Sequence, residues 1–382
     1  MKKSKILHIP ATVGGNAQTI NCQMKLLGIQ SSSWALSENS MGLGKDADKF
    51  IYKETENFFV KEIKRFWSLK YIFLYRVVFF NFGSLLHTPF PFYRFNKEEG
   101  INFLRLYLYS KYRYVMYRVE IGLLELLKVK VFVQYQGSDA RQKDYCRSNF
   151  QVMLPEHARI YTLMDRLRDE NKREQIKRFE NFAKGIYSLN PDLMHVLPSC
   201  TKFLPYCHID LEIWKPVTCN ISNYKEILKI GHAPSNRDVK GTDQILKVVK
   251  ELQPAYGKKL SFQLIENVPY DEVMHAYQSI DILIDQIHIG WYGGLAVELM
   301  ALGKPVLSYI REDDLKFIPP EMAENLPIVK TCPQTLKRNL ISLIEMPYEE
   351  LVELGKKSRQ YVEKWHCPRK VVGQLIEEMN LC

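Results

Sequence analysis

The sequence lacks the patterns that bind a structural metal. Its eight cysteines form no C-x-x-C pair, and no group of histidines accompanies them at metal-ligand spacing. This argues against a zinc module. We expect the cysteines to be reduced thiols in a reducing compartment.

Long apolar runs are also missing. The most apolar window, from Tyr71 to Leu86, is interrupted by Arg76 and Asn81 and is shorter than the roughly 20 residues that span a bilayer. The apolar run near the N-terminus is too short for the core of a signal peptide and continues into glycines. With no low-complexity tract and no internal repeat, the sequence predicts a globular cytoplasmic protein.

The chain is long enough for more than one hydrophobic core. It has 382 residues, of which 46% are hydrophobic and 12% aromatic, whereas single cores rarely grow beyond about 250–300 residues. We therefore expect two globular domains. The net charge of +10 favours a polyanion, an anionic membrane surface or a phosphorylated ligand as partner, without choosing among them.

Most of that charge lies in one aromatic segment, residues 53–118. It holds +7 of the net charge and interleaves Lys and Arg with Phe, Tyr and Trp. Such a mixture suits the headgroup zone of a membrane, where we expect the cations Lys61, Lys64, Arg65 and Lys70. An ordinary aromatic core beneath a solvated basic surface explains the same residues. Nucleic-acid binding is less favoured, because no recognised nucleic-acid module accompanies the charge.

Strands alternate with helices along most of the chain, which predicts parallel sheets with helices on both faces. In the first half we expect strands at 5–10, 30–36, 129–137 and 184–190, and helices at 19–27, 115–128, 163–183 and 192–198. In the second half we expect strands at 226–234, 260–266, 281–287 and 305–310, and helices at 242–252, 269–280, 294–302, 347–366 and 368–380.

The aperiodic, proline-containing stretch 203–222 separates these two series as a linker. The predicted fold class is therefore α/β, with two Rossmann-like doubly wound parallel-sheet domains facing a cleft. We expect an N-terminal domain over residues 1–210, with the basic and aromatic insert at about 53–118. A C-terminal domain follows over residues 217–364, and a last helix, 365–382, is expected to pack back on the N-terminal domain.

Ligands of such sheets bind beyond the carboxyl ends of the strands, so the loops there hold the candidate residues. After the first strand, Gly15 and Asn16 lead into a helix whose unpaired amides can hold an anion, although G-G-N-A is not the G-x-G-x-x-G dinucleotide fingerprint. In the loop 135–141, Asp139 can accept a proton or bind sugar hydroxyls, and Arg141 can hold an anion. A tight turn and a helix cap are the alternatives.

Two loops of the second half carry more chemistry. Arg237 and Lys240 lie three residues apart between a strand and a helix, where two cations can neutralise a diphosphate. Surface exposure alone would also explain them. Gly293 and Gly294 open another helix, and Glu298 follows about one turn in, where a carboxylate can accept hydrogen bonds from a ribose diol. An ordinary ion pair or backbone contact is the alternative for Glu298.

With these motifs the second half resembles the donor domain of GT-B-fold glycosyltransferases, in particular the large, mostly retaining bacterial family of the group 1 or family four type. The likeness lies in RDVKGTDQIL, VMHAYQSIDILID and GGLAVELMALGKPV, within about residues 230–310. The first half is similar more loosely, through GGNAQT, QGSDAR and LPYCHIDLEIWKP.

The resemblance implies that the C-terminal domain binds the nucleotide-sugar donor and the N-terminal domain the acceptor. In that family the basic pair binds the donor diphosphate and the glutamate binds the nucleotide ribose. The corresponding residues here are Arg237 and Lys240 for the diphosphate, Glu298 for the ribose, Tyr292, Gly293 and Gly294 for amide contacts, and Gly15 and Asn16 for the phosphate or acceptor.

Two departures from the family pattern stand out. The usual E-x7-E pair requires a Glu at position 290, where this chain has Gly290. The usual glycine-arginine step appears as Gly231-His232. Asp285, Gln286 or His288 would then take over contacts to the sugar.

The predicted function is transfer of a hexose-type sugar from a UDP- or GDP-sugar to a hydroxyl of a saccharide or lipid-linked saccharide. The expected pathway is bacterial cell-surface polysaccharide or glycolipid biosynthesis, at the inner face of the membrane. Cations and amides would stabilise the leaving diphosphate, so no metal and no cofactor beyond the co-substrate is expected. A retaining reaction needs no enzymic base; in an inverting one Asp139 would deprotonate the acceptor.

Two other functions fit the sequence. One is a sugar-nucleotide epimerase or hydrolase on the same fold, which would turn over the donor without an acceptor. The other is a non-catalytic protein that binds through its basic surface and would show no nucleotide binding.

Overall fold

The computed structural model describes residues 5–10, 15–38, 46–89, 103–216, 227–268 and 270–380. The chain forms two compact units, each built on a parallel sheet, so the predicted fold class of two doubly wound α/β domains is confirmed. Unit 1 comprises Met1–Cys146, Tyr161–Leu204 and Val372–Cys382, and unit 2 comprises Arg147–Ile160 and Pro205–Val371.

The sheet of unit 1 has seven strands in the order β3-β2-β1-β4-β5-β6-β7. All its neighbours pair in parallel. The order changes direction between β1 and β4, and ligands of such sheets bind at that switch point. The strands are β1 (Ile6–Ile9), β2 (Ser31–Ala35), β3 (Lys49–Phe50), β4 (Val77–Asn81), β5 (Lys130–Tyr135), β6 (Gly185–Ser188) and β7 (Lys202–Phe203).

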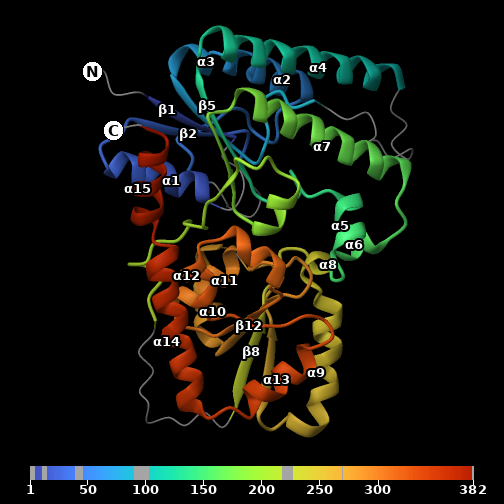
Figure 1. Cartoon of the computed structure of the whole chain (residues 1–382), viewed down its shortest axis with the longest axis vertical. Coiled ribbons are helices and arrows are strands. Elements are labelled where there is room, and N and C mark those ends of the chain that lie inside the picture. Colours follow the sequence, from blue (N-terminus) through green and yellow to red (C-terminus); the bar gives the residue numbers. More distant parts are fainter. Residues whose placement is uncertain are drawn as a thin grey trace. The chain divides into compact units, whose positions relative to one another are not determined.

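Helices cover both faces of this sheet (Figure 1). On one face, Leu7, Val78 and Val133 join the main core with residues of the helices at 71–74, 103–126 and 163–182. On the other face lie α1 and the end of α15 (Figure 1). The helices are α1 (Asn16–Leu26), α2 (Phe58–Ser68), α3 (Tyr71–Leu74), α4 (Phe103–Leu126), α5 (Lys143–Asn149), α6 (Pro155–Ala158), α7 (Leu163–Phe182) and α15 (Pro368–Glu378), with a 3₁₀ helix, η3 (Pro191–His195); α6 belongs to unit 2 and α5 runs from unit 1 into it.

The sheet of unit 2 has five parallel strands in the order β12-β11-β10-β8-β9, with its switch point between β8 and β10. The strands are β8 (Leu228–His232), β9 (Leu260–Leu264), β10 (Ile282–Gln286), β11 (Val306–Ser308) and β12 (Val329–Lys330). The helices are α8 (Arg237–Lys240), α9 (Thr242–Tyr256), α10 (Tyr270–Ser279), α11 (Gly294–Ala301), α12 (Pro320–Glu324), α13 (Leu336–Ile344) and α14 (Tyr348–Trp365), with a 3₁₀ helix, η4 (Glu312–Phe317).

The core of unit 2 lies between the central strands and two helices. Ile230, Ile284 and Leu307 pack with apolar residues of α9 and α13. The fully buried helix residues Val297 and Leu299 belong to α11, which contacts β10, β11 and α14. This packing fixes the amino end of α11 beside the carboxyl ends of β8 and β10.

Some expected elements differ in extent or were missed. Helix α4 begins at Phe103 rather than near residue 115, and the segment 192–198 forms a 3₁₀ helix. Strand β4 was not predicted: it is buried at every position, and such a strand has no polar alternation to mark it. Part of the predicted linker, residues 205–216, belongs to unit 2, and residues 217–226 lie outside the described ranges. No helix in the described ranges is long and apolar enough to cross a bilayer.

Candidate functional site

A buried ion pair spans the switch point of unit 2. The ammonium of Lys240, at the end of α8, lies 2.6 Å from Oδ1 of Asp285 at the end of β10. The other carboxylate oxygen, Oδ2, accepts a hydrogen bond of 2.8 Å from the backbone amide of Gly293, the N-cap of α11. We call Lys240, Asp285 and Gly293 the switch-point cluster. It joins a cation to the amino end of a helix where the strand order reverses.

The switch-point cluster is tightly packed. Asp285 is fully buried and the Lys240 side chain is 11% exposed. A Cβ at Gly293 would lie only 3.3 Å from Nζ of Lys240, so the glycine lets the ammonium approach the backbone of the helix start. A charge held in such surroundings acts on a ligand with little screening by water.

Arg237 does not join Lys240 in this cluster. Its guanidinium donates two hydrogen bonds to the carboxylate of Glu266, and the Arg237 side chain is about half exposed. The two cations predicted as a pair therefore lie on one turn of helix but bond to different carboxylates. Lys240 alone is buried at the switch point.

Glu298 lies one turn into α11 and is 8% exposed. Its Oε1 is 3.2 Å from Nε2 of His208, a residue the sequence did not single out. The His208 ring also covers the next residue of the helix start: a Cβ at Gly294 would meet its Cε1 at 3.1 Å. The lone carboxylate of this apolar helix thus has a polar partner, a histidine from the segment before β8.

The side chain of Tyr292 packs inside unit 2, whereas the contact predicted for this residue is through its backbone amide. It is fully buried, and its hydroxyl bonds to Nε2 of His366 at 2.9 Å and to the hydroxyl of Tyr361 at 3.2 Å. Burial lowers the pKa of His366 to about 4, so the ring is neutral and donates through Nδ1 to the carbonyl of Tyr206. Tyr292 therefore anchors the loop before α11 to α14, and only its backbone is left for a ligand.

An arginine lies over Gly290, where the family pattern has a glutamate. Gly290 has φ +89°, and a Cβ there would lie 2.8 Å from Nη1 of Arg311. The guanidinium also bonds to Asp314 at 2.8 Å and stacks on Phe150, 3.5 Å from the ring centroid. The place for a side chain at position 290 is thus occupied by a cation paired with the buried Asp314.

The other polar residues of this edge stabilise the loops. The side-chain amide of Gln286 donates to the carbonyl of Trp291, and its oxygen accepts the amides of His288 and Ile289. Burial lowers the pKa of His232 to about 4; the neutral ring donates through Nδ1 to the carbonyl of Ile284. These hydrogen bonds of Gln286 and His232 therefore hold the loops at the carboxyl edge of the unit 2 sheet.

In unit 1, the candidates after β1 and β5 also lie at the carboxyl edge of the sheet. Gly15 has φ +71° and begins α1 as its N-cap, and Asn16 is buried in the first turn. The preceding residues of this loop, 11–14, lie outside the described ranges. Glycine tolerates this left-handed backbone without strain.

Asp139 closes the turn after β5. Its carboxylate accepts the backbone amides of Gln136 and Gly137, the latter at 2.7 Å. A Cβ at Gly83, in the loop after β4, would lie 3.2 Å from its Oδ2. Burial raises the pKa of Asp139 to about 6, although the two amides favour the ionised form. The residue is both a turn cap and a carboxyl group able to exchange a proton near neutral pH.

Arg141 is committed to the fold. Its Nε lies 2.7 Å from Asp192 in a buried pair, and the coulombic attraction of Asp192 raises the pKa of Arg141 despite burial. The pair engages Nε and Nη2 of Arg141, so an anion bound as predicted would contact Nη1 or compete with Asp192.

The sheet face under α1 holds polar side chains that the sequence did not flag. His8 is fully buried and, within the described part of the chain, neither ring nitrogen has a hydrogen-bond partner; the same holds for the side-chain amide of Gln134. His8 lies beside Phe79, which lies beside Phe132 two residues before Gln134. Burial lowers the pKa of His8 to about 3, so it is neutral. A histidine in a short apolar strand was the available signal.

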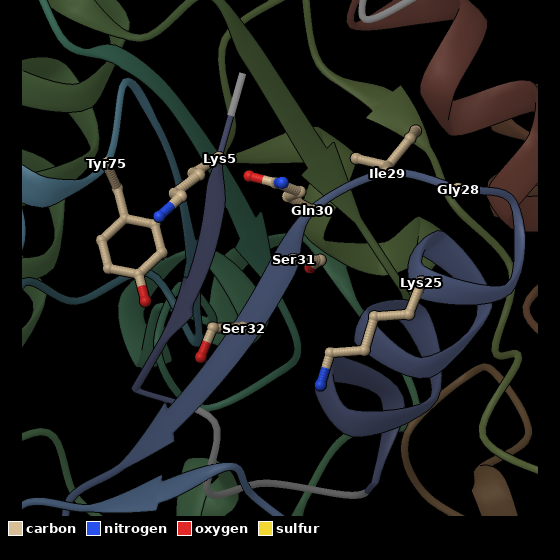
Figure 2. A pocket seen from close by; sticks show the side chains of 8 residues that line it. All are labelled: Lys5, Lys25, Gly28, Ile29, Gln30, Ser31, Ser32 and Tyr75. Atoms are coloured by element: carbon tan, nitrogen blue, oxygen red, sulfur yellow. The ribbon is translucent and has the colours of Figure 1, made fainter. Parts of the chain in front are cut away.

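A shallow pocket of about 540 Å³ opens at the other end of this sheet (Figure 2). It lies at the amino ends of β1 and β2, and its lining includes Lys5, Gln30 and Tyr75. The ammonium of Lys25, on α1, is held by Asp48 at 2.6 Å. Ligands of doubly wound sheets bind at the opposite, carboxyl edge, so we do not assign the donor or acceptor to this pocket. In the described ranges, no group of three or more His, Cys, Asp or Glu side chains is arranged to hold a metal ion.

No family model matches the sequence, and no curated protein matches it either. The fold does match solved structures. The Anabaena protein HepE, in complex with UDP-glucose, is similar with a TM-score of 0.61 at 11% identity, over 99% of this chain and 100% of that one. Sucrose-phosphate synthase from Thermosynechococcus elongatus matches with 0.60 at 13% identity, over 99% of each chain.

An epimerase shares the fold as well. UDP-GlcNAc 2-epimerase from Neisseria meningitidis, bound to UDP-GlcNAc, matches with a TM-score of 0.50 at 14% identity, over 98% of this chain and 99% of that one. At such low identity these likenesses establish the fold alone. The chain has the GT-B fold, as the sequence predicted.

Proposed function

We propose that this protein transfers a sugar from a nucleotide-sugar donor to a hydroxyl of an acceptor. The observation that carries the proposal is the switch-point cluster: a buried ammonium, Lys240, held against the amino end of α11. This is the position at which doubly wound sheets bind nucleotides. The fold agrees, since HepE has it with UDP-glucose bound.

Lys240 and the amides of α11 would bind the donor diphosphate. As the bond between the sugar C1 and the diphosphate oxygen breaks, the electron pair stays on that oxygen, and a fixed cation and helix dipole stabilise the growing charge. Asp285 is a positioning residue in this scheme, because it holds the ammonium in place before the donor arrives. Arg237 is exposed and would reach the diphosphate only after leaving Glu266.

Glu298 would accept hydrogen bonds from the ribose hydroxyls of the donor. It is the one carboxylate of α11, about one turn from the glycines that open the helix. Its contact with His208 keeps it hydrogen-bonded without a ligand. His208 thus becomes a candidate second contact to the nucleotide.

We assign binding of the acceptor to unit 1. In an inverting reaction Asp139 would take the acceptor proton as the acceptor oxygen bonds to C1, and its pKa of about 6 suits that role near neutral pH. In a retaining reaction, which we favour from the family resemblance, the departing phosphate oxygen takes the proton instead. In both routes the acceptor proton has a defined destination that does not require a metal ion.

The finer assignments follow the same resemblance. We propose a hexosyl transferase that uses a UDP- or GDP-sugar and a saccharide or lipid-linked saccharide acceptor, in bacterial cell-surface polysaccharide or glycolipid assembly. It would act in the cytoplasm, peripheral to the inner face of the membrane. The fold match to an epimerase leaves one competitor, a sugar-nucleotide epimerase or hydrolase, which would convert the donor with no acceptor present.

The ribose assignment gives a sharp test. Glu298→Gln should lower the affinity for the cognate nucleoside diphosphate by about 1 kcal/mol, because the amide oxygen of glutamine still accepts a hydrogen bond from the ribose but carries no charge. Removing the ribose 2′-hydroxyl should weaken binding to the wild type more than binding to Glu298→Gln. Isothermal titration with UDP, GDP and their 2′-deoxy forms measures both effects.

The control is Glu353→Gln, an exposed carboxylate on α14. It should leave nucleotide affinity unchanged. Equal losses on 2′-deoxygenation in wild type and Glu298→Gln would refute the ribose contact. Binding of no nucleotide at all would refute the transferase itself.

A further inference from the structure

Helix α2 faces the protein with its charged side and solvent with its apolar side. The side chains of Phe59, Ile63 and Trp67, one and two turns apart, are 70%, 57% and 68% exposed. On the inward face, Glu62 and Arg65 are each only 12% exposed and lie 2.5 Å apart. A surface helix normally buries its apolar stripe, so this helix has the reverse of the usual arrangement.

The inward charges are stabilised by specific partners. Glu62 accepts a hydrogen bond of 3.1 Å from the hydroxyl of Tyr109 and lies 3.5 Å from Arg113, both on α4. Arg65 donates to the hydroxyl of Tyr52 at 3.1 Å. These contacts fix the rotation of α2 about its axis. The outward turn of its aromatic residues is therefore part of the folded state.

The apolar surface continues beyond α2. Phe66 is 47% exposed, and on α3 Phe73 and Leu74 are 65% and 55% exposed. We define the α2–α3 face as Phe59, Ile63, Phe66, Trp67, Phe73 and Leu74. A contiguous apolar patch of this kind on a soluble domain usually marks an interaction site.

Cations border this face. Lys70, between α2 and α3, and Arg76, after α3, are exposed and make no ion pair with any described residue. The other cations that the sequence suggested are engaged: Lys61 and Lys64 lie near Glu54 and Glu56, and Arg65 is buried. The free positive charge at the face thus comes from Lys70 and Arg76.

We propose that the α2–α3 face docks the protein on the surface of an anionic lipid bilayer. Aromatic and aliphatic side chains would enter the boundary between headgroups and acyl chains, and the flanking cations would meet lipid phosphates. A second copy of the chain is a poorer occupant, because it would place the same unpaired cations opposite one another. The inference does not depend on sugar transfer, since it concerns residues of unit 1 outside the switch-point cluster.

Vesicle binding by the full-length protein tests the proposal. We expect flotation with vesicles of phosphatidylcholine containing phosphatidylglycerol and little with phosphatidylcholine alone, with binding that weakens as salt rises. The double variant Phe59→Ser/Trp67→Ser should lower the partition coefficient at least about tenfold. Lys70→Gln and Arg76→Gln should each lower it about fivefold on anionic vesicles only.

Matched controls separate docking through the α2–α3 face from nonspecific adsorption to vesicles. Ile213→Ser, at a residue 62% exposed in unit 2, and Lys258→Gln, an exposed lysine there, should leave binding unchanged. Trp67 is the most exposed of the five tryptophans, so its emission should shift to the blue with anionic vesicles. Unchanged melting temperatures would show that the variants fold.

Several results would overturn the proposal. The first is that the wild type floats with neither kind of vesicle. The second is that the Phe59→Ser/Trp67→Ser variant floats as well as the wild type. The third is that this variant loses self-association and nothing else. Binding to RNA through these residues without binding to vesicles would do the same. Nucleotide titration on the same samples keeps the two proposals apart, because failed docking with intact nucleotide affinity leaves the transferase proposal standing.

Discussion

Replacing Lys240 by methionine removes the cation of the switch-point cluster while keeping an unbranched apolar stem. The change has two separable effects. Among the described residues, it leaves the fully buried carboxylate of Asp285 with the backbone amide of Gly293 as its one remaining hydrogen-bond donor. It also removes the charge proposed to bind the diphosphate. The first effect concerns stability and the second concerns affinity.

The stability loss should be large. Breaking a buried ion pair from one side costs about 3–5 kcal/mol, because the remaining charge stays buried without compensation. For a domain of roughly 150–250 residues each kcal/mol moves the melting temperature by about 2–4 °C. We therefore expect unit 2 of Lys240→Met to melt about 6–20 °C lower than in the wild type.

A second substitution repairs stability without restoring the cation. In Lys240→Met/Asp285→Asn the amide oxygen at position 285 can still accept from Gly293, and no buried charge remains. Most of the melting temperature should return. The nucleotide affinity should stay low by about 1.5–3 kcal/mol, or about 10- to 150-fold, because a hydrogen bond to a charged group is missing in both variants.

Calorimetric melting and nucleotide titration on the wild type, both single variants and the double variant complete the cycle. Recovery of nucleotide affinity together with stability in the double variant would refute our reasoning, because Lys240 would then act only on the fold. An Arg237→Met variant provides the comparison: it lies on the same turn but is exposed and bound to Glu266, so it should change stability little.

Two further predictions concern single residues. Folding raises the pKa of Asp139 from 3.8 to about 6. The protonated carboxyl group therefore stabilises the folded state fully below about pH 3.8, and this stabilisation is lost as the pH rises through about 6. Melting temperatures measured against pH should show the loss in the wild type and not in Asp139→Asn. If Asp139 is the base, kcat/KM should rise through about pH 6 in the wild type, and a rise that persists in Asp139→Asn would exclude it. Gly290→Ala should destabilise the protein by about 1–3 kcal/mol, because a residue with φ +89° would be strained and its Cβ would lie 2.8 Å from Arg311. Denaturant unfolding measures this against Gly373→Ala, where a Cβ meets nothing within 4 Å and the helix should gain stability.

The sequence indicated the two parallel sheets because alternation of strands and helices is a local property. Most predicted strands and helices formed close to their expected places, and the loops at the carboxyl edges followed from strand direction alone. Gly15, Asp139, Lys240 and Glu298 lie at such edges. Local pattern failed for β4, whose continuous burial leaves no period to read.

Partners far apart in the chain required the fold. Lys240 and Asp285 are 45 residues apart and meet only because β8 and β10 are neighbours in the sheet. Arg311, the N-cap of η4, reaches Gly290 from the loop after β11. The glycine in place of an expected glutamate was visible in the sequence, whereas the arginine that covers it was not.

Helix α2 shows most clearly what each level decides. Its sequence contains an apolar stripe and a charged stripe at helical spacing, although no helix was among the elements expected there from the sequence. Which face turns inward depends on Tyr109 and Arg113 of α4, which bind Glu62 and so place Phe59 and Trp67 in solvent. A periodic sequence fixes the angle between side chains on one helix, but the neighbours packed against that helix fix its rotation, and only the tertiary structure supplies the neighbours.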